Sequence, residues 1–244
     1  MNPCHLCAEI MKSNLIREIL ESHFDPKEDF IYGFADLTNL LDDSFGDFKY
    51  GIPIGKRLDH KIVNGILSGP TLEYYQHYRR INEELVSLTR TISEDLKNCG
   101  IETICIEPTV TTHELDTVYA ENLTYPVSHK MVATRAGLGW IGKSDLFVSK
   151  AFGPRLRLVS MLTDQPLAIE HEPIDSSRCG KCKICMDRCP AHAINGKLWD
   201  ISVNREEFFD ARKCRSKCKE LGEKYLKMDA AVCGICVAVC PFGW

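Results

Sequence analysis

The chain has 244 residues, of which 44% are hydrophobic, and its 30 basic and 34 acidic side chains give a net charge of −4. This length allows one large domain, or a medium domain with a small one attached. No apolar run is long enough to predict a membrane-spanning helix, and the charge gives no overall case for binding nucleic acid. The N-terminal segment mixes acids and bases into its apolar positions, as amphipathic helices do and signal peptides do not, so we expect a cytoplasmic protein without a membrane partner.

The first 170 residues alternate signals for helices and strands. Apolar residues between 15 and 20 predict an amphipathic helix, and residues 30–34 predict a short strand. Apolar residues then recur at intervals of three and four from Leu72 to Leu96, which predicts a long helix that Gly100 closes. Two further strands are predicted downstream, at residues 101–106 and 156–162. We therefore expect an α/β domain over residues 1–170.

A glycine-rich segment, residues 136–143 with the sequence AGLGWIGK, contains the G-x-G-x-x-G pattern of a dinucleotide-binding site. That chemistry requires a strand before the glycines and a helix after them, so that the pyrophosphate meets the amides of the helix N-terminus. Here residues 127–136 predict a helix with Ser128 as its N-cap, and residues 145–149 predict a strand. The order is reversed, which argues against a nucleotide site. The structural alternative is a tight turn beneath a core tryptophan, Trp140.

The cysteine-rich region follows an acidic stretch at residues 170–175, which predicts a linker. Nine of the thirteen cysteines lie after residue 178. Disulfides are uncommon in cytoplasmic chains, so clustered cysteines predict metal ligands. The region repeats a C-x2-C-x3-C-P unit, and its first copy is the full C-x2-C-x2-C-x3-C-P run of bacterial ferredoxins. We expect residues 171–244 to form a small ferredoxin-like α+β domain with two [4Fe–4S] clusters.

The spacing also divides these cysteines between the clusters. In two-cluster ferredoxins, the fourth cysteine of each run ligates the other cluster. The second run has Ala230 where its first cysteine would stand, so one ligand must come from upstream, and Cys214 and Cys218 are the candidates. The predicted ligands of the first cluster are Cys179, Cys182, Cys185 and Cys240, and those of the second are Cys189, Cys233, Cys236 and one of the two upstream cysteines.

Two alternatives explain cysteines in other ways. Structural zinc would also use thiolates, but a proline after each fourth cysteine is typical of iron–sulfur motifs rather than zinc ribbons. Cys4 and Cys7 form a lone C-x-x-C pair, which is either half of a metal site or two unrelated thiols. Cys99 lies at a predicted helix end and Cys105 in a predicted strand, and we expect both to be core-packing residues rather than metal ligands.

With both halves in view, the chain resembles epoxyqueuosine reductases and, more distantly, reductive dehalogenases, which are cobalamin-dependent iron–sulfur enzymes. The resemblance runs from about Gly100 to Phe242, and it is carried by the glycine-rich segment, by residues 162–164 and by Asp210-Ala-Arg-Lys-Cys214. It implies that residues 1–170 form a nitroreductase-like α/β domain that carries cobalamin above the ferredoxin-like domain. It also implies that Cys214, rather than Cys218, completes the second cluster.

For the glycine-rich segment, the resemblance implies contact with a corrinoid. Backbone without side chains approaches a broad, flat macrocycle closely. The indole ring would offer an apolar face, and the lysine could meet a propionamide or the phosphate of the nucleotide tail. The implied corrinoid-binding residues are Gly137, Gly139, Trp140, Gly142 and Lys143.

Two functions follow from these features. In the first, an oxidoreductase similar to epoxyqueuosine reductase passes low-potential electrons from the two clusters to a bound corrinoid, and Glu107 or His129 delivers a proton to an unidentified small molecule or modified nucleoside. In the second, the chain is a ferredoxin-type electron carrier, or a reductive activator of a corrinoid protein, without a substrate of its own. Either one would receive electrons from a donor such as ferredoxin or flavodoxin. The sequence ends at Trp244 without the helical-repeat extension that helps epoxyqueuosine reductases hold tRNA, so it does not favour tRNA as the substrate.

Overall fold

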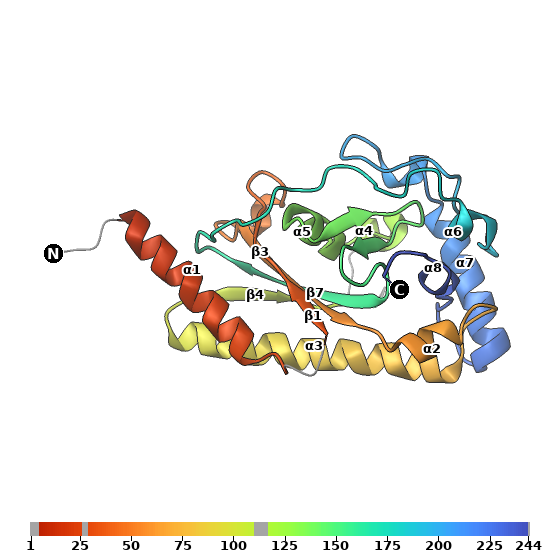
Figure 1. The fold of residues 1–244 in the computed structure, drawn as a ribbon, viewed down its shortest axis with the longest axis horizontal. Helices are drawn as coiled ribbons and strands as arrows, with labels where there is room; N and C mark the ends of the chain where they lie inside the picture. Colours follow the sequence, from red (N-terminus) through yellow and green to blue (C-terminus); the bar gives the residue numbers. More distant parts are fainter. Residues whose placement is uncertain (1–4, 26–28, 110–116, 244) are drawn as a thin grey trace. The chain divides into compact units, whose positions relative to one another are not determined.

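The computed structural model describes residues 5–25, 29–109 and 117–243, and Figure 1 shows the arrangement of the chain within it. The elements, in chain order, are α1 (His5–Ser22), β1 (Phe30–Tyr32), β2 (Ala35–Asp36), η1 (Asp43–Phe45), β3 (Tyr50–Arg57), α2 (His60–Asn64), α3 (Leu72–Asn98), β4 (Thr103–Ile106), α4 (Thr117–Asn122), α5 (His129–Arg135), β5 (Gly139–Ile141), β6 (Phe147–Ser149), β7 (Leu156–Thr163), α6 (Ile184–Asp187), η2 (Arg205–Glu207), α7 (Ala211–Leu221), η3 (Gly222–Leu226) and α8 (Ile235–Ala238).

The fold is mixed α/β, which confirms the predicted class at this level. The chain forms two compact units. The first unit holds residues up to 56, 82–138 and 158–173, and the second holds residues 57–81, 139–157 and those from 174 onward. The second unit therefore combines the cysteine-rich region with two segments from earlier in the chain. The division into domains at residues 1–170 and 171–244 stays a prediction.

The first unit is built on a sheet. Among the described residues, β1, β3, β7 and β4 lie in that order, and β2 also pairs with β3. Both β1 and β2 are antiparallel to β3, and β4 is antiparallel to β7. The helix α5 contributes Val132 and Ala136 to a buried core that also contains Leu37 and Leu162. Apolar side chains from the helix and the sheet thus form a single cluster within this unit.

The sequence patterns miss the strand β3. Its sequence, YGIPIGKR, contains two glycines and a proline, which are depleted in strands, yet its six inner residues are buried. The pairing of β3 with its two neighbours β1 and β2 explains why a proline is tolerated in this strand. Residues 50–51 pair with β2 and residues 54–56 pair with β1, so Pro53 lies where the partner strand changes and its missing N–H is tolerated on that side.

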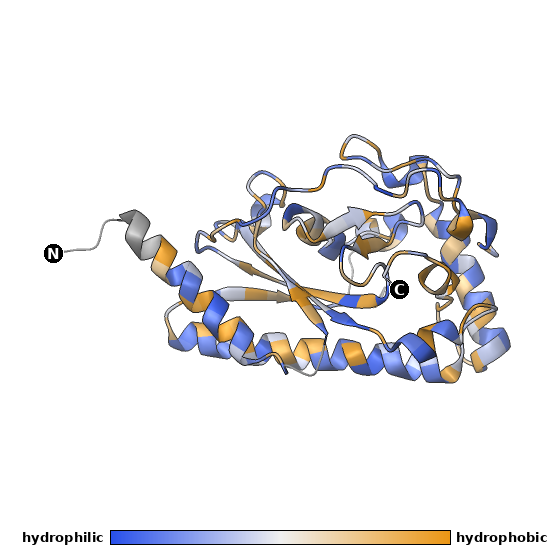
Figure 2. Ribbon diagram, in the orientation of Figure 1, coloured by the Kyte–Doolittle hydropathy of each residue, from blue (hydrophilic) through white to orange (hydrophobic). Residues whose placement is uncertain are grey.

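The helix α3 confirms the long periodic helix predicted from the sequence. Ile81, Leu85, Ile92 and Leu96 are buried along it, and Figure 2 shows hydrophobic and hydrophilic residues alternating along the same helix. Gly100 follows with φ of +75°, a conformation that lets the chain turn away from the helix end. In the part of the chain that the structure describes, no helix combines the length and the apolar character needed to cross a membrane.

The second unit begins its hairpin inside the glycine-rich segment. The strands β5 and β6 pair in an antiparallel manner, with Trp140 opposite Val148. The predicted helix before this segment is α5, and the side chain of Ser128 caps it by accepting a hydrogen bond from the N–H of Met131. The helix-then-strand order is confirmed, but the strand begins at Gly139, within the glycines, and not only after them. Because glycine is uncommon in strands, the sequence pattern does not predict β5.

Candidate metal centre

The first cysteine run folds as a tight loop followed by one turn of helix. The N–H of Cys182 donates to the carbonyl oxygen of Cys179 at 3.1 Å. Gly180 between them has φ of +52°, which glycine adopts without steric cost. Cys185 then lies on α6. Three thiols consequently surround one space, as the C-x2-C-x2-C spacing predicts.

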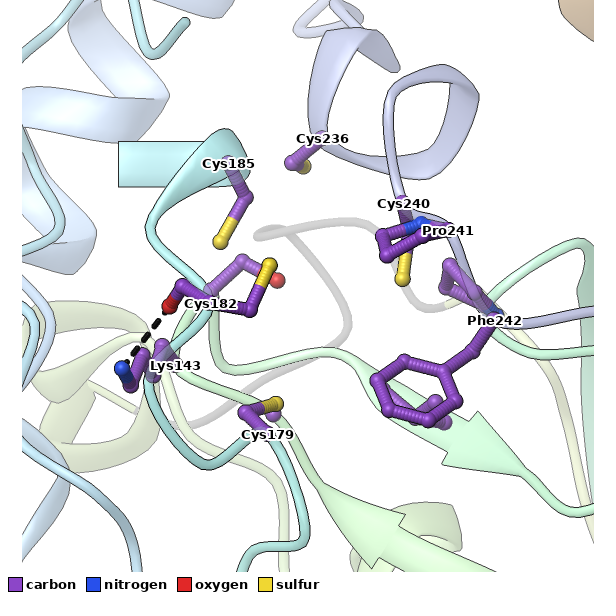
Figure 3. Close-up of a pocket in the computed structure, with 12 residues that line it drawn as sticks. Lys143, Cys179, Cys182, Cys185, Cys236, Cys240, Pro241 and Phe242 are labelled. Atoms are coloured by element: carbon purple, nitrogen blue, oxygen red, sulfur yellow. Dashed lines mark hydrogen bonds between the residues drawn. The ribbon is translucent and has the colours of Figure 1, made fainter. Parts of the chain in front are cut away.

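The second cysteine run supplies the opposite wall of this space. Its helix α8 begins after Gly234, and Pro241 follows Cys240 at the end of the run. A pocket lies between the two runs. Figure 3 shows the sulfur atoms of the four predicted ligands of the first cluster around this space. The residues that line it are Gly142, Lys143, Ser144, Val148, Pro154, Cys179, Cys182, Cys185, Cys236, Cys240, Pro241 and Phe242.

The shape and chemistry of this pocket fit a cluster. Within the described residues, no three histidine, cysteine, aspartate or glutamate side chains form a group that could hold a single metal ion. The four thiols are instead spread around a wider space, as the corners of a cubane require. Burial, and then the charge of neighbouring sulfurs beginning with Cys179, raises the pKa of Cys185 to about 11. Deprotonation of Cys185 therefore calls for a compensating positive charge, which bound iron would supply.

The cysteines predicted for the second cluster meet near α7. The carboxylate of Asp210 caps this helix by accepting from the N–H of Lys213 at 2.9 Å. The sulfur atoms of Cys214 and Cys218, one turn apart on the helix, lie 3.9 Å from each other. A hydrogen bond from Cys218 is the main cause that lowers the pKa of Cys233 to about 7. The structure therefore places both upstream candidates beside the second cysteine run.

Cys236 connects the two groups of thiols. It lines the first pocket. Burial raises its pKa well above the usual value, and the charges of Cys233, Cys214, Cys185 and Cys189 act in the same direction. The nine cysteines from Cys179 to Cys240 thus form one neighbourhood, which supports two adjacent clusters. The assignment of individual ligands to each cluster stays a prediction.

The glycine-rich segment is part of the pocket wall. The ammonium group of Lys143 donates to the carbonyl oxygens of Gly180, at 2.9 Å, and Cys182, at 2.8 Å. Trp140 is 5% exposed. Its ring meets that of Phe242 edge-on, with the ring centroids 5.1 Å apart. The second half of the segment thereby supports the loop that carries the first cysteines.

These contacts bear on the predicted corrinoid site. A Cβ atom on Gly139 would lie 2.2 Å from the carbonyl oxygen of Val148, so the hairpin itself requires glycine there. Gly137, in the first unit, has φ of +68° and backs onto His171. Trp140 and Lys143 are buried, so the segment presents no open face that fits a macrocycle. Corrinoid binding by these residues stays a prediction, and each of them already has a structural partner.

The two residues predicted as proton donors lie together in the first unit. The Nε2 atom of His129 donates to the backbone carbonyl oxygen of Glu107 at 2.9 Å, and its Nδ1 atom lies 2.9 Å from the hydroxyl of Ser160. The carboxylate of Glu107 forms a 2.8 Å ion pair with Arg90. The histidine therefore joins the start of α5 to the end of β4 and to β7. Its role, or that of Glu107, in proton delivery stays a prediction.

Sequence reasoning did not single out Arg155. It is fully buried, and its guanidinium group donates to the carbonyl oxygens of Ala238, Cys240 and Phe242 at 2.7, 3.1 and 3.2 Å. These carbonyls belong to the second cysteine run. A basic residue is usually exposed, so the sequence carried no signal that this one is buried.

Comparison with known proteins supports the iron–sulfur assignment. Residues 178–243 match the family described as the 4Fe-4S double cluster binding domain. The match covers both cysteine runs and the two upstream candidates. It confirms the prediction of two [4Fe–4S] clusters as cofactors.

Two groups of proteins are similar to more of the chain than the cysteine-rich region. An epoxyqueuosine reductase from Synechococcus sp. (strain CC9605) is 31% identical over 176 residues, which cover 68% of this chain and 46% of the reductase. The chain thus spans about half the length of this curated relative.

A reductive dehalogenase whose structure suggests a mechanism for B12-dependent dehalogenation matches with a TM-score of 0.65 and 15% identity, covering 94% of this chain and 31% of that one. An epoxyqueuosine reductase solved with an epoxyqueuosine-modified tRNA-Tyr stem loop matches with a TM-score of 0.57 and 18% identity, covering 96% and 65%. The resemblance read from the sequence is confirmed, and the two structural matches concern the fold alone.

Proposed function

We propose that this chain is an iron–sulfur oxidoreductase of the epoxyqueuosine reductase type, which passes low-potential electrons from two [4Fe–4S] clusters to a bound corrinoid for the reduction of a substrate. The pocket in which Cys179, Cys182, Cys185 and Cys240 meet carries the proposal. The similarity to an epoxyqueuosine reductase supports the oxidoreductase chemistry, and the B12-dependent dehalogenation named for a structural relative supports a corrinoid. A bound corrinoid would supply the cobalt centre at which the substrate is reduced.

The residues of the chain would hold the clusters and keep water from them. Thiolates of the two runs bind iron, with Cys214 as the eighth ligand. Trp140, Val148 and Phe242 pack around Cys179 and form an apolar wall on that side. Because these apolar side chains exclude water, they strengthen the electrostatic effect of any charge near the cluster. They thereby help to set the reduction potential of the cluster.

The finer fold assignment and the partners belong to the same proposal. We place a nitroreductase-like corrinoid-binding domain before the ferredoxin-like domain, in a cytoplasmic protein. The substrate would be a modified nucleoside or a related small molecule, which the complex of a structural relative with modified tRNA supports. His129 or Glu107 would deliver the proton, and a ferredoxin or flavodoxin would supply electrons.

A second function has one observation in its favour. The glycine-rich segment is buried against the cluster loop and leaves no open face for a macrocycle. That arrangement suits a ferredoxin-type carrier, or a reductive activator of a corrinoid protein, which needs clusters but no substrate pocket. The two functions differ in whether this chain itself binds a corrinoid.

Anaerobic reconstitution distinguishes them. We expect about eight irons per chain with matching sulfide, and tight uptake of cobalamin seen as corrinoid absorbance that remains after gel filtration. Zinc in place of iron, or only about four irons, would contradict the two-cluster basis of both functions. Full iron without corrinoid uptake would favour the carrier.

A further inference from the structure

Two buried cations in one segment of the chain, residues 139–157, contact the two cysteine runs. Lys143 is 4% exposed, and its ammonium group donates to the carbonyl oxygens of Gly180 and Cys182. Both carbonyls lie in the loop that carries the first three predicted ligands. Figure 3 shows the bond to Cys182 beside the ring of sulfur atoms. Because a buried ammonium group is unfavourable unless it is hydrogen-bonded, these bonds tie the lysine firmly to that loop.

Arg155 makes the equivalent connection to the other cysteine run. It is completely buried, and it donates to Ala238, the last residue of α8, at 2.7 Å. Its other amino group donates to Cys240 at 3.1 Å and to Phe242 at 3.2 Å. Carbonyls at a helix C-terminus lack partners within the helix, and a cation there also suits the helix dipole. Burial lowers the pKa of Arg155 and the charge of Cys240 opposes that change, but a guanidinium group stays protonated in proteins.

Among the described residues that line the pocket, one cation has no carboxylate to balance it. Among the described residues that line it, no side chain is a carboxylate, and Lys143 is the one residue with a positive charge. A thiolate-bound cluster is anionic, and it gains a further negative charge when one electron enters. Fixed positive charge in a poorly solvated site stabilises the more negative state, which raises the reduction potential.

We propose that Lys143 and Arg155 are positioning residues that hold the two halves of the first cluster's pocket together, and that the charge of Lys143 raises the reduction potential of that cluster. Lys143 is then a residue of the iron–sulfur centre and not a corrinoid ligand. The inference rests on the proposed two-cluster function. It adds that Lys143 raises the reduction potential of the first cluster and that Arg155 supports the second cysteine run.

The test is a redox titration of the reconstituted holoprotein, followed by EPR, with dithionite as the one-electron reductant. We expect Lys143→Met to lower the midpoint potential of one cluster and to leave the other unchanged, with about eight irons retained. Lys143→Arg should restore the potential of the wild type, since it keeps the charge and can donate to both carbonyls. Arg155→Lys keeps the charge but cannot reach three carbonyls at once, so it should preserve the potential while lowering the melting temperature. Lys150→Met is the matched control, because Lys150 is exposed in the same segment, and it should change neither quantity.

Unchanged potentials in Lys143→Met with full iron would overturn the proposal. So would loss of the cluster in both Lys143→Met and Lys143→Arg, because the charge alone would then not suffice. If Lys143→Met cannot hold the cluster, Lys143→Arg must hold it at the potential of the wild type. A wild-type protein without two clusters would instead contradict the proposed function, so the two failures are distinguishable.

Discussion

At the scale of single residues, Cys214 and Cys218 compete for one position. Their sulfur atoms lie 3.9 Å apart on adjacent turns of α7, and both are near the second cysteine run. Thiolates on different corners of a cubane point away from one another, so the two neighbours do not suit separate corners of one cluster. The resemblance to epoxyqueuosine reductases favours Cys214.

We therefore expect Cys214→Ser to remove one cluster and Cys218→Ser to keep both. Iron analysis should fall from about eight to about four per chain in the first variant and stay near eight in the second. The EPR spectrum of the reduced first variant should lose the interaction between two paramagnetic clusters. If the two variants exchange these results, Cys218 is the ligand. If each single variant keeps about eight irons and only the double variant loses a cluster, the two thiols substitute for one another.

Gly139 provides a prediction about stability. A Cβ atom there would lie 2.2 Å from the carbonyl oxygen of Val148 and 2.8 Å from the ring of Phe147. The backbone of a paired hairpin cannot retreat easily, so Gly139→Ala should lower the free energy of unfolding by about 1–3 kcal/mol or more. Anaerobic chemical denaturation followed by circular dichroism measures this change.

Gly142 is the matched control for that substitution. A Cβ atom there would meet a methyl group of Val148 at 3.0 Å and the sulfur of Cys179 at 3.6 Å. A side-chain methyl group can shift, so Gly142→Ala should cost clearly less than Gly139→Ala. Equal losses would show that steric contact within the hairpin is not what selects glycine at position 139.

At the scale of elements, the N-cap of α7 fixes the helix that presents Cys214. Asp210 accepts from the N–H of Lys213, and this bond is the main reason why its pKa is lowered. A carboxylate whose pKa is lowered by folding stabilises the protein above its unfolded pKa, and this contribution is lost as the pH falls through the lower folded value. The cap should therefore act fully at neutral pH.

We expect Asp210→Ala to lower the melting temperature and to speed the release of iron at pH 7. The difference in melting temperature from the wild type should stay constant down to about pH 5 and shrink below about pH 4, where aspartate becomes protonated. Asp210→Asn should retain most of the stability at pH 7, because its side-chain oxygen can also cap the helix. Thermal unfolding followed by circular dichroism at several pH values checks this, and a difference that grows in acid would exclude the proposed cap.

The elements also show what the sequence could predict. The helices α3 and α5 follow from apolar spacing and from the Ser128 cap, which are local signals. The strand β3 does not, because its glycines and its proline are tolerated only through the way β1 and β2 divide the register. The strand β5 was missed for a similar reason. The close approach of the Val148 carbonyl oxygen that requires glycine at position 139 exists only in the folded hairpin.

At the scale of the whole molecule, the cysteines of the metal site could be predicted from the sequence. The residues that hold the cysteine-bearing segments in place could not. Cysteine spacing is a local code, and four of the five cysteines that line the first pocket are those it predicts as ligands of the first cluster. The contacts of Lys143 and Arg155 join residues that lie far apart in the sequence, and no local pattern records them. For the same reason, the sequence alone could not show that Trp140 packs against Phe242.

The distribution of charge along the chain is uneven. Residues 178–229 carry 13 basic and 8 acidic side chains, whereas the rest of the chain carries 17 and 26. Near the first cysteine run, the exposed charged residues are mostly basic: Arg178, Lys181, Lys183 and Arg188, with Asp187 as the acidic one. An acidic electron donor would be attracted to this surface, and complementary charge mainly increases the rate of association.

We expect the double substitution Lys181→Glu and Lys183→Glu to slow the reduction of the clusters by an acidic flavodoxin roughly tenfold at low ionic strength. Stopped-flow absorbance at the cluster band measures the rate. The difference from the wild type should shrink as salt rises, because screening becomes effective within about 10 Å at 0.1 M.

Photoreduced deazaflavin, a neutral small reductant that needs no docking surface, should reduce both proteins at similar rates. Lys224→Glu, at an exposed lysine of η3, changes the charge outside the first cysteine run and should leave the rate with flavodoxin near that of the wild type. If the double variant is reduced by flavodoxin as fast as the wild type, the donor does not approach over the first cysteine run, whatever the function of the clusters it reduces.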